Sequence, residues 1–395
     1  MAVCLINCLA QPRQCQIRGL EARQGCPTSF FCVLLQWAAM KNWDVIVIGA
    51  GIIGLSLSIE LRKKGASVLV VERGEPGQEA SHAAGGMLVD WPPETLPALQ
   101  ALATASARMY PELAHELQVE SGRSVDLRDP GTIFFPSSAH ASQAALESVA
   151  KLPAPLCEFE PALGDLNRPA FYLKERCVDP RALTTAAFHA AKHRGVDFSS
   201  GDAVTALNLS DSCVSGVATR KTSFLAAKVV NCAGAWSGQI GPHAFPTRPV
   251  KGQMLCLVSP WRTLLKHVIR SPEVYLIPRS DGRIIVGTTV EEAGFDKRTD
   301  VATIQRLHHA AVAMVPELRH AKILEDWAGL RPGTPDALPI LGSTPTPGYY
   351  VATGHFRDGI LLAPITAQVM AEVIEGKSPD HDLAPFSPAR FSGAT

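Results

Sequence analysis

Residues 43–74 read WDVIVIGAGIIGLSLSIELRKKGASVLVVERG. The apolar, β-branched run Val45–Ile48 is typical of a parallel strand that is covered on both faces. A segment with helical spacing of apolar residues follows and ends before Gly65, and a second β-branched run occupies Val68–Val71. The stretch therefore predicts a strand–helix–strand unit at the start of an α/β fold.

Three glycines join the first strand to the helix. Gly49, Gly51 and Gly54 have the G-x-G-x-x-G spacing of dinucleotide-binding units, and the strand and helix around them support that interpretation over a purely structural turn. The first glycine permits a tight turn, the second lets backbone amides approach a pyrophosphate, and the third lets the helix pack closely on the strand. Glu72 ends the second strand, where a carboxylate meets a ribose 2′-hydroxyl and disfavours NADP. The pattern does not separate FAD from NAD.

Composition limits the partners. The chain has 395 residues, enough for two domains or one elaborated α/β domain, with 37 basic and 37 acidic residues. This neutral balance indicates neither a nucleic acid nor a membrane surface as partner and favours a small molecule. No apolar run reaches the roughly 18 residues that a membrane-spanning helix needs.

Cysteines indicate a reducing, cytoplasmic setting. Five of the ten cysteines lie in the first 32 residues, and no pair has C-x-x-C spacing. We therefore expect no metal site and no redox dithiol, and we expect the cysteines after residue 42 to be mostly small buried groups. Residues 1–42 differ in composition from the rest of the chain, and we interpret them as an extension without ordered structure, upstream of a native start at Met40. A targeting peptide is the alternative, since basic residues precede an apolar stretch.

The remaining elements are predicted from local patterns. The small residues of Gly77–Gly86 predict a loop close to a ligand, with a flexible surface loop as the alternative. A second apolar strand that runs into 231–237, NCAGAWS, predicts another approach of backbone to the dinucleotide. Helices are expected at 96–120 with an interruption at Pro111, at 140–151, from Asp179, at 300–315 and from Ile360 to about Ile374. Antiparallel strands are expected at 250–258, 274–277 and 284–287, with a turn at Asp281-Gly282.

Two segments near the C-terminus carry candidate ligand groups. Arg331 lies in WAGLRPG, and a guanidinium in such surroundings suits a bidentate substrate carboxylate. Tyr275 lies on a strand and is expected to offer its hydroxyl to the same ligand. A structural ion pair and a sheet-edge tyrosine are the alternatives. The helix that begins at Ile360, after the glycine-flanked segment 354–359, is expected to direct amides at an anionic group, and His355 is given no catalytic role.

These segments together resemble the glycine oxidase (ThiO) flavoproteins of the D-amino acid oxidase and sarcosine oxidase superfamily. The resemblance spans about Trp43 to Ile374. It rests on VIVIGAGIIG, SHAAGGML, NCAGAWSG, PVKGQ, YLIPRSDGRIIVG, WAGLRPGTPD and GHFRDGILLAP.

The resemblance implies noncovalent FAD and oxidative deamination of glycine or a similar small amine, such as sarcosine or a small D-amino acid, by dioxygen. Ammonia and hydrogen peroxide would be the products, and the reaction would supply the synthesis of the thiamine thiazole. It also implies an α/β fold in which a Rossmann-like FAD-binding domain, discontinuous in sequence, carries an inserted, β-rich antiparallel substrate domain. The predicted ranges are 43–90, 150–240 and 325–377 for the first domain, 91–149 and 245–324 for the second, and 378–395 for a tail.

By position, the resemblance assigns Arg331 to the substrate carboxylate, Tyr275 to a hydrogen bond with it, and Arg357 to the same pocket. Met87 and Val290 would line that pocket. Val290 stands where the family pattern has methionine and Glu273 where it has histidine, so the preferred amine stays open. The residues expected to contact FAD are Gly49, Gly51, Ile53, Gly54, Glu72, Arg73, Ser81, Ala83, Ala84, Gly85, Gly86, Met87, Val204, Cys232, Ala233, Gly234, Trp236, Gly354, His355, Arg357, Gly359, Ile360 and Leu361.

Rival functions remain at this stage. A dehydrogenase of the same superfamily would pass electrons to an acceptor other than oxygen, and a noncatalytic flavoprotein would use FAD as a sensor or scaffold. A pyridine-nucleotide disulfide reductase is disfavoured because a second G-x-G-x-x-G and a redox dithiol are missing. The sequence leaves a homo-oligomer open.

Overall fold

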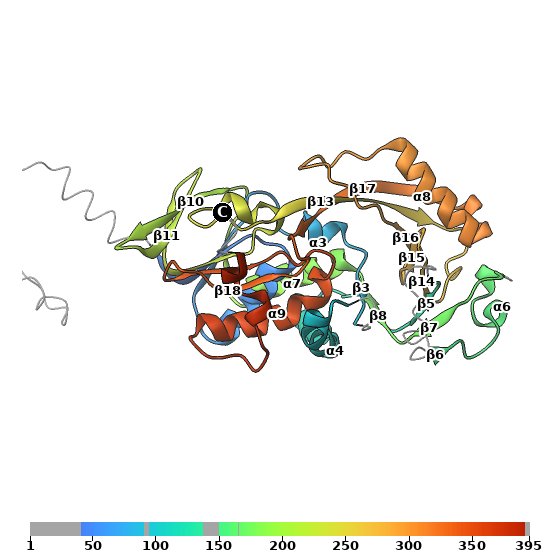
Figure 1. Ribbon diagram of the computed structural model, residues 1–395, viewed down its shortest axis with the longest axis horizontal. Coiled ribbons are helices and arrows are strands. Elements are labelled where there is room, and N and C mark those ends of the chain that lie inside the picture. Colours follow the sequence, from blue (N-terminus) through green and yellow to red (C-terminus); the bar gives the residue numbers. More distant parts are fainter. Residues whose placement is uncertain (1–40, 91–94, 137–149, 165, 392–395) are drawn as a thin grey trace, which may run out of the picture. The chain divides into compact units, whose positions relative to one another are not determined.

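The computed structural model describes residues 41–90, 95–136, 150–164 and 166–391 (Figure 1). The predicted N-terminal extension and most of the helix predicted at 140–151 lie outside these residues. The chain from Asn42 onward forms one compact unit. In the described part of the chain, no helix is long and apolar enough to cross a membrane, and no cluster of metal-ligating side chains is found.

The first sheet is built on the predicted strand–helix–strand unit, which is confirmed. Strand β1 pairs in parallel with β2 and with β12, and β12 pairs in parallel with β19. The order is β10-β11-β12-β1-β2-β9, with β19 beside β12 and β18 beside β19. The strands are β1 (Asn42–Ile48), β2 (Val68–Val71), β9 (Asp197–Ser199), β10 (Val204–Ser210), β11 (Cys213–Thr219), β12 (Ser223–Asn231), β18 (Ile340–Ser343) and β19 (Tyr349–Thr353).

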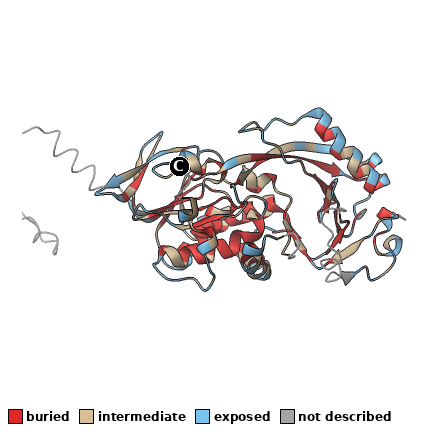
Figure 2. Ribbon diagram, in the orientation of Figure 1, coloured by how far each residue is buried: buried red, intermediate tan, exposed pale blue. Residues whose placement is uncertain are grey.

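Four helices cover one face of this sheet: α2 (Ile52–Lys63), α4 (Gln100–Ser121), α7 (Pro180–His193) and α9 (Gly359–Ile374). Because side chains alternate along a strand, Val45 and Val47 of β1 pack in the helix-side core, whereas Ile46 and Ile48 pack in the core of the other face. Figure 2 shows α9 mostly in the colour of buried residues. The β-branched run is thus buried on both faces, as its composition predicted.

The predicted interruption at Pro111 is wrong, because α4 runs unbroken through it. A proline inside a helix leaves the carbonyl four residues earlier without its usual donor. The carbonyl of Ala107 instead accepts a hydrogen bond from Arg176 Nη1 at 3.4 Å. Helix α9 shows the same solution, since the buried Tyr110 hydroxyl donates to the carbonyl of Ile360, four residues before Pro364.

A second sheet has the order β17-β13-β16-β15-β14-β5-β7-β6 and is antiparallel except where β14 meets β5. Helix α8 (Val301–Met314) packs on β13 and β16 (Figure 1, orange). The predicted hairpin turn is confirmed, with Gly282 at φ +92°. The strands are β5 (Thr132–Phe134), β6 (Ala150–Lys151), β7 (Phe171–Leu173), β13 (Arg248–Val258), β14 (Val268–Arg270), β15 (Tyr275–Pro278), β16 (Arg283–Gly287) and β17 (Lys322–Gly333).

The sheets divide the chain differently from the predicted domain ranges. Helix α4, assigned to the substrate domain, packs on α9 and α7, whereas β6, β7 and β17, assigned to the FAD domain, pair within the second sheet. A small third sheet joins β3 (Met87–Leu88), β8 (Arg176–Val178) and β4 (Leu127–Arg128). The misassignment has a physical reason, since an apolar helix face or strand edge does not specify which of two cores it joins.

The cysteine prediction holds for three of the five cysteines after residue 42. Cys177, Cys232 and Cys256 are buried, whereas Cys157 and Cys213 are exposed. Cys213 opens β11 directly after a turn in which Asp211 and Ser212 have positive φ, so its place at a hairpin tip exposes it.

Candidate active site

A cavity of about 840 Å³ is lined by residues of both large sheets. Its walls come from the glycine turn after β1, the short helix α3 (Ala80–Ala83) with the loop to Met87, the end of β12, strands β13, β15 and β17, and the start of α9. All predicted site residues line this cavity except Gly54, Gly354 and Leu361.

These three residues act in packing. A Cβ on Gly54 would lie 2.0 Å from the carbonyl oxygen of Gly49, so the glycine allows α2 to approach β1, the task that the sequence predicted for it. A Cβ on Gly354 would lie 2.6 Å from Thr334 Cγ2, and Leu361 is buried in the helix-side core.

The glycine turn is held by two side chains that were predicted to face the cofactor. Glu72 accepts hydrogen bonds from Ala50 N at 2.8 Å and Gly74 N at 2.9 Å, one on each carboxylate oxygen. Ser81 Oγ accepts from Ile52 N, the first residue of α2, at 2.9 Å. Both side chains therefore shape the nucleotide cleft in addition to lining it.

Arg279 is a functional residue that the sequence analysis missed. Its buried guanidinium donates to the carbonyl oxygens of Gly85 at 2.6 Å and Val178 at 2.9 Å, and so fixes the glycine-rich loop that lines the cavity. Burial lowers the pKa of Arg279. The sequence does carry a signal for this role, because Arg279 is a charged residue directly after the apolar run YLIP.

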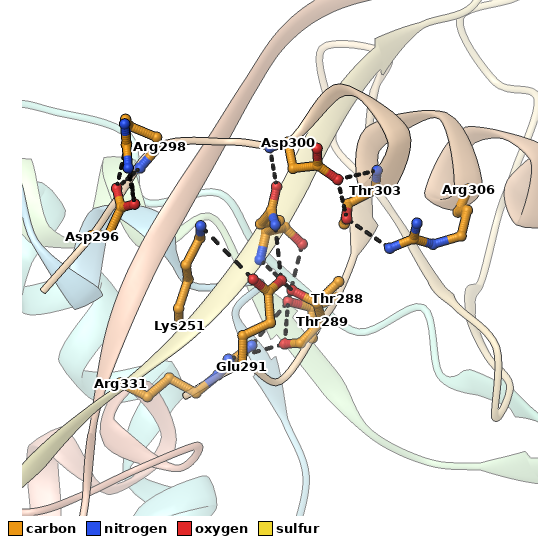
Figure 3. Close-up of polar contacts among 11 residues, drawn as sticks. Lys251, Thr288, Thr289, Glu291, Asp296, Arg298, Asp300, Thr303, Arg306 and Arg331 are labelled. Atoms are coloured by element: carbon orange, nitrogen blue, oxygen red, sulfur yellow. Dashed lines mark hydrogen bonds and ion pairs between the residues drawn. The ribbon is translucent and has the colours of Figure 1, made fainter. Parts of the chain in front are cut away.

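Arg331 presents a cation to the cavity. From β17 its Nη1 donates to the carbonyl of Thr289 at 3.2 Å and its Nη2 to Thr288 Oγ1 at 2.9 Å (Figure 3). Among the described residues no carboxylate pairs with it within 4.0 Å, and burial lowers the pKa of the guanidinium, which still remains charged at neutral pH. A half-buried guanidinium that touches only neutral oxygens can accept an incoming carboxylate.

Tyr275 lies beside Arg331 in the same wall. Its hydroxyl contacts Met254 Sδ at 3.7 Å, and burial raises its pKa, so the hydroxyl stays protonated. Gly85 and Gly287 leave room for the ring, because a Cβ on Gly287 would lie 2.7 Å from the Tyr275 hydroxyl oxygen. The structure thus brings together the two predicted substrate ligands.

Gly252 on β13 makes room for Arg331. A Cβ there would lie 2.3 Å from Nη1 and 2.4 Å from Nη2 of Arg331, so Gly252→Ala is expected to push the guanidinium aside. The displaced atoms are the far end of a flexible side chain, so the thermal midpoint should stay unchanged while a small carboxylate ligand of the cavity binds about tenfold or more weakly. Ligand titration and thermal denaturation of the variant test this, and an unchanged ligand affinity would contradict it.

The start of α9 carries three ionisable side chains. Arg357 is exposed at the cavity wall. Burial raises the pKa of Asp358 to about 6, although the positive charge of Arg357 acts to lower it. His355 is buried, contacts Thr366 Oγ1 through Nε2 at 3.1 Å, and has its pKa lowered by burial to about 3. His355 is therefore neutral, in line with the prediction that it takes no acid–base part.

The neutral His355 gives a pH prediction. Its folded pKa of about 3 lies below the unfolded value, so its favourable contribution is complete above the unfolded pKa and is lost as the pH falls. The loss amounts to about 2 kcal/mol at pH 5. His355→Gln should therefore keep the thermal midpoint more nearly constant between pH 7 and pH 5 than the parent protein does. Asp358 acts in the opposite direction but is common to both proteins, and equal pH dependence would refute the prediction.

The two positions that depart from the family pattern lie on the cavity wall. Val290 is 54% exposed there. Glu273 pairs with Arg168 at 3.4 Å, and the two side chains are 54% and 36% exposed. Neither position places a buried charge against the substrate ligands.

The comparisons with known proteins agree with this geometry. A family model described as “FAD dependent oxidoreductase” (DAO) matches residues 44–373. The chain belongs to this family. This FAD-dependent oxidoreductase is 34% identical over 362 residues to glycine oxidase of Pseudomonas aeruginosa, a match that covers 87% of the chain and 98% of that relative.

Two further matches extend the comparison. The bifunctional protein ThiO/ThiG of Trichormus variabilis is 35% identical over 361 residues. This match covers 88% of the present chain but only 55% of that relative. The crystal structure of glycine oxidase from Geobacillus kaustophilus matches with a TM-score of 0.83 at 30% identity, and the match covers 88% of this chain and 99% of that one. The predicted fold, resemblance and enzyme class are confirmed: the protein is an FAD-dependent amino acid oxidase of the glycine oxidase type.

FAD fits the residues that line the cleft. Gly49 has φ +103° and a Cβ there would lie 2.6 Å from the carbonyl oxygen of Cys232, so the turn is open only to glycine. A Cβ on Gly51 would meet nothing nearer than Ser81 Oγ at 3.3 Å, which leaves the start of α2 facing the cavity with bare backbone. A helix start of this kind is suited to a pyrophosphate.

Proposed function

We propose that the protein oxidises glycine or a similar small amine, such as sarcosine or a small D-amino acid, with dioxygen as the electron acceptor. The products are hydrogen peroxide and an imine, which hydrolyses to a 2-oxo acid and ammonia, or to a 2-oxo acid and methylamine when the substrate is sarcosine. The observation that carries this proposal is the guanidinium of Arg331, which lies in the cavity wall with two neutral oxygen partners. The match to glycine oxidase over nearly the full length of both chains supports the same substrate class.

The residues of the chain bind and orient. Arg331 holds the substrate carboxylate through charge-assisted hydrogen bonds, and Tyr275 donates its protonated hydroxyl to the same group. Bound FAD supplies the two-electron acceptor for the Cα–H bond of the amine. With the carboxylate fixed, the amine and Cα are held in one orientation, and this positioning is the main contribution that the protein makes to the rate.

No side chain needs to move a proton in this scheme. The amine reacts in its neutral form, and the neutral His355 and protonated Tyr275 fit a site that works without an acid–base pair. The starts of α2 and α9 bring backbone amides and positive dipole ends to the cavity wall, where they favour the phosphates and the negative charge that the reduced cofactor carries.

The proposal also covers the fate of the product. Since relatives include the bifunctional protein ThiO/ThiG, we propose that the imine formed from glycine feeds thiamine thiazole synthesis. The chain spans about half of that relative, 55%, so the partner that would consume the imine lies outside this sequence match.

The test is the stoichiometry of aerobic turnover. Purified protein reconstituted with FAD should consume one dioxygen and release one hydrogen peroxide and one ammonia per glycine oxidised. Catalase should return half of the oxygen. Ammonia formation that depends on an added quinone or dye and gives no peroxide would replace the oxidase by a dehydrogenase. No product from glycine, sarcosine or small D-amino acids would overturn the substrate class.

A further inference from the structure

The Arg331 guanidinium is held in place by one short loop. Both of its hydrogen-bond acceptors, the Thr289 carbonyl and the Thr288 hydroxyl, lie in the segment that follows β16. On the other side the guanidinium rests on the bare Cα of Gly252, where a Cβ would lie 2.6 Å from Cζ. The direction in which Arg331 points therefore depends on what fixes the 288–291 segment.

Glu291, which does not line the cavity, is bonded both to that segment and to β13. Its Oε1 accepts hydrogen bonds from the Thr289 hydroxyl and from Gln253 Nε2, the latter at 2.8 Å. Its backbone pairs with Lys251 through hydrogen bonds of 2.8 and 2.9 Å, and its Oε2 lies 3.8 Å from Lys251 Nζ. Figure 3 shows the Glu291 carboxylate between the Lys251 side chain and the two threonines, and the Arg331 guanidinium ending at the same threonines.

The partners of Glu291 are themselves buried. Gln253 is 1% exposed and Lys251 6% exposed, and both lie on β13, between β17 and β16 of the second sheet. Gln253 Oε1 accepts from Asp300 N at 2.7 Å, which ties the network to the start of α8. The carboxylate thus joins the threonine loop to the buried strand next to β17.

The negative charge of Glu291 also supports the arrangement of Arg331. Burial alone raises the pKa of Glu291, but the hydrogen bonds from Thr289 and Gln253 outweigh burial and hold the pKa below its usual value. The resulting negative charge favours the charged form of Arg331 without contacting it within 4.0 Å, so the guanidinium keeps its donors free for a ligand.

We propose that Glu291 is a positioning residue for the substrate carboxylate: through Thr288 and Thr289 it sets the orientation of Arg331. The inference rests on the proposed role of Arg331 and extends it to a residue outside the cavity wall. Since Glu291 contacts neither substrate nor cofactor in this scheme, its removal should weaken carboxylate binding and leave the cofactor in place.

The test measures binding of glycolate, a small carboxylate, to the FAD-loaded protein by the perturbation of flavin absorbance, together with glycine kinetics. Glu291→Ala should raise the Kd for glycolate and the KM for glycine about tenfold while kcat changes little. Glu291→Gln should fall between, because its amide oxygen can still accept the hydrogen bonds from Thr289 and Gln253 that Oε1 accepts, while the negative charge is lost. Glu292→Ala, which removes a neighbouring carboxylate that is 62% exposed, should behave as the parent protein.

A double-mutant cycle separates positioning from a general structural effect. In an Arg331→Ala background, Glu291→Ala should cause little further loss of glycolate binding, because the group that it orients is gone. Equal losses in both backgrounds, or normal glycolate binding in Glu291→Ala, would overturn the inference. Normal glycolate binding in Arg331→Ala would instead overturn the proposed carboxylate site itself. FAD content and thermal midpoint of each variant identify a protein that fails to fold, in which case Glu291→Gln carries the test.

Discussion

Arg331→Ala is expected to raise the KM for glycine about a hundredfold or more, since removal of one partner of a buried charge pair costs about 2–5 kcal/mol. The described acceptors of the guanidinium are Thr288 and Thr289, neither of which belongs to the glycine turn, so FAD content should not change. The value of kcat should fall less than kcat/KM, because the carboxylate is held in both the ground state and the transition state.

Arg331→Lys is the matched control for this prediction. It keeps the charge but loses the planar fork, so it should recover part of the affinity without restoring the parent KM. Comparing glycine with a small primary amine that has no carboxylate sharpens the measurement, because the amine should be oxidised equally poorly by parent and variant. A KM within a factor of about two of the parent value in Arg331→Ala would remove this residue from the substrate site.

Gly54→Ala is expected to weaken FAD binding by tenfold or more and to lower the thermal midpoint as well. The added Cβ would lie 2.0 Å from the Gly49 carbonyl oxygen and 3.2 Å from Val47 Cγ1, so α2 must move off β1. Overpacking of this kind costs about 1–3 kcal/mol in stability. The start of α2 moves with the helix, which should reduce FAD affinity by tenfold or more on the scale of about 1.4 kcal/mol per decade.

Gly51→Ala is the control that separates an effect on FAD binding from an effect on the packing of α2. Its Cβ would meet only Ser81 Oγ at 3.3 Å on the protein side, and its φ of −73° suits alanine. The stability of the FAD-free protein should therefore be kept while FAD affinity falls, because the methyl group enters the cleft. FAD titration and thermal denaturation of both FAD-free variants provide the test. Parent-like FAD affinity in Gly54→Ala would contradict the role given to the turn.

The first strand–helix–strand unit was predictable because its determinants are local. Val45–Ile48, three glycines and Glu72 each specify backbone conformation or burial within 30 residues of sequence, and the structure places them as expected. Packing partners far along the chain were not predictable in this way. The helix through Pro111 depends on Arg176, and the buried carbonyl of Ile360 depends on Tyr110, 250 positions away.

The site residues also divide into those that local sequence predicts and those that depend on distant partners. Arg331 and Tyr275 were found because a charge and a hydroxyl in apolar or glycine-rich surroundings are unusual, and the structure places both on the cavity wall. Gly252 and Gly287 were not singled out, since the need for a missing side chain appears only when a partner from another strand lies against it. Arg279 and Glu291 were missed because they act through backbone or side-chain contacts to the lining residues.

The most direct measurement is anaerobic addition of glycine to the purified, FAD-loaded protein while flavin absorbance is followed. The account predicts bleaching of the oxidised flavin band by glycine, and a perturbed but unbleached spectrum with glycolate, which offers the carboxylate to Arg331 without the amine. Protein that takes up FAD but is not bleached by glycine, sarcosine or any small D-amino acid would contradict the account.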